Sequence, residues 1–166
     1  MSHVHDLING ERKRRGVSTV YWSRKMAQLA QSQADYCAKV GHLVHSSRYA
    51  FQGGENLAQG GSYFSPRSIV DCWLQSKAGH REYLLSHRVK KAGVGISKSR
   101  GKTFVAWAFS DENPSYPDCP YYKKSSISLS WSSRKYPSSA KNNTSIAIVI
   151  TLVVTAVILL KVFRII

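Results

Sequence analysis

The sequence predicts an α+β domain followed by a linker and one transmembrane helix. Helical periodicity fills most of residues 4–85, and two strand-like runs come after it without any alternation of helix and strand. An uncharged stretch near the C-terminus predicts the membrane helix. The 166 residues are enough for one compact core and too few for two domains with separate cores.

The first two predicted helices are bounded by recognisable signals. Residues 4–15 form a short helix that ends at Gly16. Residues 24–40 carry apolar side chains at helical spacing, with Ser23 as the N-cap and Gly41 as the C-terminal stop. Both helices therefore belong to the N-terminal half of the domain.

A third helix begins at Ser65-Pro66, because serine is a favoured N-cap and proline a favoured first helical residue. Gly79 interrupts this helix near its end, and residues 81–85 form a further short turn of helix. The buried face of the third helix carries Ile69, Val70 and Trp73.

Two strand-like runs complete the domain, which spans residues 1–113. Residues 92–96 and 103–109 are rich in apolar and β-branched side chains, and Gly101 lies in the turn between them. The pair is predicted to form an antiparallel hairpin against which the helices pack.

Residues 114–144 have the composition of a tether, with four prolines, many serines and few aliphatic side chains. The basic residues of this linker favour contact with anionic lipid headgroups, and the alternative is a solvated linker whose charges only maintain solubility. These basic residues are Lys123, Lys124, Arg134, Lys135 and Lys141.

Residues 145–166 are predicted to be a transmembrane helix with a basic end. The 18 residues of 146–163 span about 27 Å as a helix, close to the hydrocarbon thickness of a bilayer. Lys161 and Arg164 can reach the far headgroups. The N-terminus has no apolar segment typical of a signal peptide, which favours a cytoplasmic domain. The numbers of basic residues on the two sides of the helix are too similar to predict its orientation.

The charge predicts anionic surroundings such as lipid headgroups, nucleic acid or acidic glycans, because 24 basic residues face 9 acidic ones. Three cysteines are too few for a disulfide scaffold. Cys37 and Cys72 fall within predicted helices and Cys119 in the linker, so no motif for a cysteine or serine nucleophile is present and enzyme activity is not favoured.

Three polar residues are the candidates for a binding cleft. His45 follows the second helix, Glu55 follows two glycines in a turn, and His80 follows the third helix. Each alone is open to a structural interpretation, and so are Asn9 and Arg12 on one side of the first helix. Together, the two histidines and the acid predict a shared His/Glu/His cleft.

The order of these segments resembles the superfamily of cysteine-rich secretory proteins, antigen five and pathogenesis-related proteins, the CAP or SCP-like domain. This resemblance implies an α-β-α sandwich with a central antiparallel sheet and an extracytoplasmic domain. It also implies that Asn9 and Arg12 make structural polar contacts. The residues that carry it are Leu7, Ile8, Asn9, Arg12, His45, Ser46, Gly54, Glu55, Asn56, Leu57, Ala58, Trp73, Gly79, His80, Arg81, Gly93, Val94 and Gly95.

The family's cleft holds two histidines and two acids, and three of these positions match here as His45, Glu55 and His80. The fourth position is Ser76, a departure that resembles the prokaryotic-type branch of the family. Glu82 could supply a second carboxylate.

Two imidazoles and a carboxylate can hold a divalent ion such as zinc, with His45 and His80 as the metal ligands and Glu55 as the base of any catalysis. The resemblance implies binding of lipids, sterols or other small molecules. The leading hypothesis is therefore a membrane-anchored domain that binds a small or lipidic ligand at a metal-capable cleft.

Two alternatives come from other functional classes. The first is a metal-dependent, peptidase-like hydrolase that uses the same cleft. The second is a basic adaptor for glycan or nucleic acid, suggested by 17 basic against 8 acidic residues in 1–113. Nucleic acid is the less favoured partner, because the sequence shows no recognised nucleic-acid-binding motif.

Overall fold

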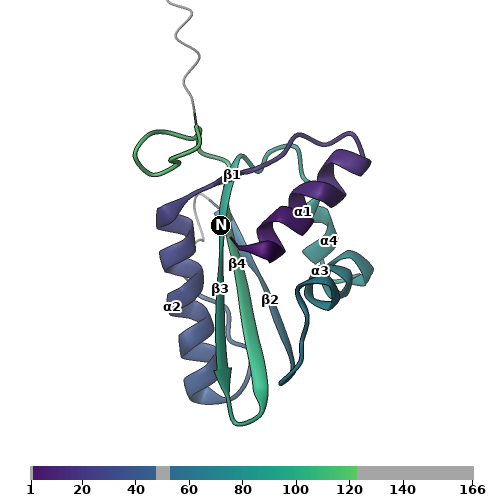
Figure 1. Cartoon of the computed structure of the whole chain (residues 1–166), viewed down its shortest axis with the longest axis vertical. Coiled ribbons are helices and arrows are strands. Elements are labelled where there is room, and N and C mark those ends of the chain that lie inside the picture. Colours follow the sequence, from purple (N-terminus) through teal and green to yellow (C-terminus); the bar gives the residue numbers. More distant parts are fainter. Residues whose placement is uncertain (1, 48–52, 123–166) are drawn as a thin grey trace, which may run out of the picture. The chain divides into compact units, whose positions relative to one another are not determined.

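The computed structural model describes residues 2–47 and 53–122, all within one compact unit of residues 1–125 (Figure 1). Along the chain the elements are α1 (His3–Arg14), β1 (Tyr21–Trp22), α2 (Arg24–Val40), β2 (Gly53–Gly61), α3 (Pro66–Gln75), α4 (His80–Leu84), β3 (Lys91–Ser99) and β4 (Lys102–Ser110). The predicted α+β class is confirmed.

The sheet is mixed, with strand order β1-β3-β4-β2. The predicted hairpin is present as the antiparallel pair β3–β4, and β2 pairs antiparallel with β4 on the other side. The two-residue strand β1 pairs parallel with β3, so the prediction of a wholly antiparallel sheet is wrong at this edge. Two residues are too few to show the alternating pattern by which strands are recognised in a sequence.

Helices cover both faces of the sheet (Figure 1). Helix α2 packs on β3 and β4, while α1, α3 and α4 lie on the opposite face. The side chains of β4 alternate accordingly: Phe104, Ala106 and Ala108 belong to the core under α2, and Val105, Trp107 and Phe109 belong to the core under the other helices. Successive side chains of a strand point to opposite faces of the sheet, and helices cover both faces, so β4 is buried on both sides.

The helix boundaries follow the predicted caps. The Ser23 hydroxyl accepts a hydrogen bond from the Met26 amide at the start of α2, and Gly41 ends the helix at φ 85°. Ser65 caps α3 in the same way. Helix α3 ends at Gln75, before Gly79, whose φ of 87° instead sets the start of α4.

The glycine-rich segment that contains Glu55 is strand β2 and not a turn. A Cβ atom at Gly53 would lie 2.0 Å from the Phe109 carbonyl oxygen, and one at Gly54 would lie 2.7 Å from the Phe109 ring. The glycines thus permit a close approach between β2 and β4.

Residues 114–122, which their composition assigns to the linker, pack against the domain. The Asp118 carboxylate accepts hydrogen bonds from the Ser23 hydroxyl at 2.7 Å and from the Lys25 amide at 2.8 Å. Asp118 also lies 3.4 Å from the ammonium group of Lys91, and the neighbouring Cys119 is buried. The packed domain therefore extends to at least Tyr122.

The rest of the predicted linker and the predicted membrane helix lie outside the described residues. Within residues 2–47 and 53–122, no helix combines the length and apolar character needed to cross a membrane.

The structural roles implied for Asn9 and Arg12 are confirmed. The Asn9 side chain donates to the Val20 carbonyl and accepts from the Val20 amide, which fixes the chain between α1 and β1. The buried Arg12 guanidinium donates to the carbonyls of Ser18, Leu84, Ser86 and Val89. One side chain of α1 thereby holds the segments before β1 and after α4 in place.

Candidate functional site

His45 and Glu55 form a direct pair. His45 Nδ1 lies 3.0 Å from Glu55 Oε1, and the Ser46 amide donates to the same oxygen at 2.6 Å. The Glu55 side chain is only 2% exposed, whereas that of His45 is 64% exposed. A buried carboxylate on β2 thus orients an imidazole that faces solvent.

His80 is held at the start of α4 by two contacts. Its Nδ1 lies 2.8 Å from the Ser76 hydroxyl, and its carbonyl accepts a hydrogen bond from Asn56 Nδ2 at 2.9 Å. Asn56 follows Glu55 in β2, so neighbouring residues of one strand fix both histidines. The positioning roles of Asn56 and Ser76 were not predicted, because they depend on contacts across 24 and 4 residues, respectively.

Burial lowers the pKa of His80, and the charge of His45 lowers it further, while Glu82 opposes both effects. The two imidazoles are therefore close enough to interact electrostatically. Because the pKa falls below its usual 6.5, His80 is neutral at pH 7. The exposed Glu82 acts on His80 through its charge, and no hydrogen bond to either ring is among its described contacts.

A hollow of about 520 Å³ opens beside His80. Its floor is apolar and its rim is polar. The lining residues are His42, Leu43, Leu57, Ala58, Gln59, Cys72, Trp73, Ser76 and His80. Of the four residues predicted for the cleft, only His80 lines this hollow; the structure pairs His45 with Glu55 next to it and leaves Glu82 on the surface of α4.

The floor is fixed by the indole of Trp73, which is fully buried. Its Nε1 donates to the Leu57 carbonyl at 2.9 Å and so joins α3 to β2. Two elements that line the hollow, α3 and β2, are thus joined by a buried hydrogen bond.

The donors available for a metal are two imidazoles. Among the described residues, no group of three or more histidine, cysteine, aspartate or glutamate side chains is arranged to hold an ion. Glu55 uses Oε1 to orient His45, the position that a carboxylate takes behind a metal-binding histidine. Because Nδ1 of each ring is occupied, Nε2 is the atom that each could offer.

The three cysteines are free thiols. Cys37 and Cys119 are buried, in line with the prediction that Cys37 is a small core residue, whereas Cys72 is exposed on α3 at the rim of the hollow. Cys72 is thus the only accessible thiol of the chain.

Comparison with known families matches residues 5–110 to the cysteine-rich secretory protein family. The match covers more than half of the chain and contains every element that builds the hollow. The chain belongs to this family. The mixed sheet with helices on both faces is accordingly its CAP domain.

Curated relatives of the CAP domain include two proteins from Solanum lycopersicum. Pathogenesis-related leaf protein 6 is 31% identical over 99 residues, which cover 60% of this chain and 55% of that protein. Pathogenesis-related leaf protein 4 is 35% identical over 69 residues, which cover 42% of this chain and 40% of that protein. The chain thus spans about half the length of the curated relatives it matches.

Solved structures share the fold at low identity. An extracellular protein containing an SCP domain from Bacillus anthracis superposes with a TM-score of 0.55 at 19% identity, over 68% of this chain and 40% of that one. An outer surface protein from Borrelia burgdorferi superposes with a TM-score of 0.55 at 18% identity, over 64% of this chain and 88% of that one. Both likenesses show the shared fold, and the prokaryotic-type branch stays a prediction.

Proposed function

We propose that this CAP domain binds a small or lipidic ligand in the hollow beside His80. The observation that carries the proposal is the hollow itself, whose volume of about 520 Å³ lies within the range of small-molecule sites, roughly 300–1,000 Å³. Its apolar floor and few polar rim groups are also typical of such sites.

The lining favours an uncharged amphipathic ligand such as a sterol. The exposed Leu43 offers apolar surface to a hydrocarbon body, and the nearly buried Leu57 and Ala58 add a little more. The neutral His80 ring and the Gln59 amide offer hydrogen bonds to a hydroxyl group without requiring a charge on the ligand.

A substitution at the rim tests this proposal. Cys72→Trp places a large side chain in the hollow from an exposed position, and we expect it to weaken binding of a fluorescent sterol at least about tenfold, or roughly 1.4 kcal/mol. Cys72→Ser keeps the size of the side chain and is the matched control. Fluorescence titration of the full chain in a neutral detergent measures both, and equal affinities of the two variants would contradict the proposal.

We propose further that His45 and His80 bind a zinc ion through two imidazoles, with Glu55 orienting His45. Zinc titration by calorimetry should show binding that His45→Ala with His80→Ala abolishes. His3→Ala with His87→Ala, which removes two exposed imidazoles elsewhere, should leave it intact. Because burial lowers the pKa of His80, protons compete with zinc for this ring less than for an ordinary histidine. If all variants bound zinc with the same affinity, His45 and His80 would not be the zinc ligands.

Membrane tethering by residues 145–166 completes the proposal, supported by their uncharged run and basic end. Glu55 is not among the residues that line the hollow, so the arrangement does not favour the hydrolase alternative.

A further inference from the structure

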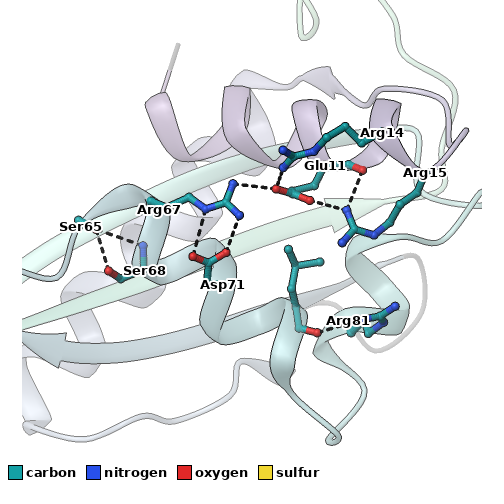
Figure 2. Close-up of polar contacts among 9 residues, drawn as sticks. Glu11, Arg14, Arg15, Ser65, Arg67, Ser68, Asp71 and Arg81 are labelled. Carbon is teal, nitrogen blue, oxygen red and sulfur yellow. Dashed lines mark hydrogen bonds and ion pairs between the residues drawn. The ribbon is translucent and has the colours of Figure 1, made fainter.

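A second polar site lies between α1 and α3, away from the hollow. The Glu11 side chain, 2% exposed, contacts three guanidinium groups (Figure 2). Arg14 and Arg67 both reach Oε1, the latter at 2.8 Å, and Arg15 reaches Oε2. Arg67 also pairs with Asp71 within α3, at 2.8 Å. The site therefore joins the end of one helix to the start of another.

Positive charge exceeds negative charge at this site. Three guanidiniums face two carboxylates, although a single guanidinium is enough to neutralise the buried Glu11. Each guanidinium carries five N–H donors, and the described contacts of Arg14 use only one of its nitrogens. All three guanidinium nitrogens of Arg67 contact carboxylate oxygens of Glu11 or Asp71, which leaves one further N–H on each terminal nitrogen. The Arg14 and Arg67 side chains are 62% and 51% exposed, so these remaining donors are open to solvent.

The shared carboxylate oxygen also fixes the geometry. Because Arg14 and Arg67 converge on Oε1, their guanidinium groups are held near one another without the aid of any ligand. An anion that binds there does not have to immobilise two long side chains, which lowers the entropic cost of binding. Arginine is the residue best suited to hold phosphate in two-point contact.

We propose that the exposed sides of Arg14 and Arg67 bind a phosphate monoester group. The excess positive charge would attract the phosphate group, which would accept hydrogen bonds from both guanidiniums. Its source is either a soluble phosphate compound or the headgroup of an acidic phospholipid, which share this chemistry.

This site is independent of the hollow proposed for the small or lipidic ligand. The two sites share no described residue, and Arg67 lies five residues before Cys72, the first residue of α3 that lines the hollow, a separation of roughly 7.5 Å along the helix. Substitutions at one site should leave the other unchanged.

Calorimetry on the full chain in a neutral detergent tests the proposal with three probes: inorganic phosphate, glycerol 3-phosphate, and micelles containing phosphatidic acid, with phosphatidylcholine micelles as the reference. We expect Arg14→Gln with Arg67→Gln to weaken phosphate binding by at least about tenfold, because each charged hydrogen bond contributes strongly. Arg14→Gln alone, at the more exposed position, should weaken it with the fold retained. Binding of the soluble probes assigns a soluble source, and binding of phosphatidic acid alone assigns the lipid.

Two further variants separate the site from general attraction. Lys98→Gln with Lys102→Gln removes two exposed charges near the β3–β4 turn and should leave binding unchanged. Arg14→Lys with Arg67→Lys keeps the charge but loses the planar groups, and it should bind more weakly than the wild type. Three results would overturn the proposal. They are no binding by the wild type, an equal loss of binding in the Lys98/Lys102 variant, and tighter binding of single-stranded DNA than of any phosphate probe at the same salt.

Discussion

Gly95→Ala is expected to destabilise the domain by at least about 3 kcal/mol, a large share of the roughly 5–15 kcal/mol by which ordinary domains are stable. A Cβ atom at this position would lie 2.2 Å from the Gln31 amide nitrogen and 2.3 Å from the Ala30 carbonyl carbon. Both atoms belong to the backbone of α2, which cannot move without separating the helix from β3. Urea denaturation followed by circular dichroism measures the loss.

Gly10→Ala is the matched control, because a Cβ atom there meets nothing within 4 Å. Gly10 lies inside α1, where alanine is preferred over glycine, so the variant should gain roughly 0.5–1 kcal/mol. If Gly95→Ala were as stable as the wild type, the close contact of α2 with β3 would be refuted.

Arg12→Met should cost about 3–5 kcal/mol of unfolding free energy. The substitution keeps the aliphatic stem and removes the donors that serve the carbonyls of Ser18 and Leu84, each at 2.7 Å, and of Ser86 at 3.0 Å. Carbonyls left without a partner in the interior each cost about 1–3 kcal/mol, and these costs are not fully additive.

Arg12→Lys should recover only a small part of this stability, since one ammonium group cannot reach carbonyls in three directions. Arg81→Met is the control, because the exposed Arg81 makes a single long contact, 3.4 Å to the Leu74 carbonyl. Urea denaturation of the three variants gives the comparison. A loss at Arg12 no larger than that at Arg81 would contradict the role of Arg12 as a clamp.

Most of the fold could be predicted because its determinants are local. The cap at Ser23 and the stop at Gly41 fix α2, and the alternating apolar residues of β4 identify a strand. Strand β1 and residues 114–122 could not be predicted from the sequence. Strand β1 is held by its pairing with β3, and residues 114–122 are held by long-range contacts such as that between Ser23 and Asp118, across 95 residues. No local pattern signals such contacts.

The candidate site could be predicted only in part. Their sequence context suggested His45, Glu55 and His80 as a shared cleft, the resemblance to the family supported the choice, and the structure pairs the first two. Ser76, noted in the sequence only as the place of a missing acid, instead positions His80 through a hydrogen bond at 2.8 Å. A cleft with His80 was predicted, but the other residues that line the hollow were not, because they come from separate elements whose facing sides depend on the register of β2 and the packing of α3.

The rate at which N-ethylmaleimide modifies Cys72 tests the central claim most directly. Cys72 is the exposed thiol at the rim of the hollow, and the buried Cys37 and Cys119 contribute little to the signal. The account predicts that a saturating fluorescent sterol slows the modification at least about tenfold, because the bound ligand covers the thiol. A sterol that binds to the full chain and leaves the rate unchanged would show that the ligand site lies elsewhere.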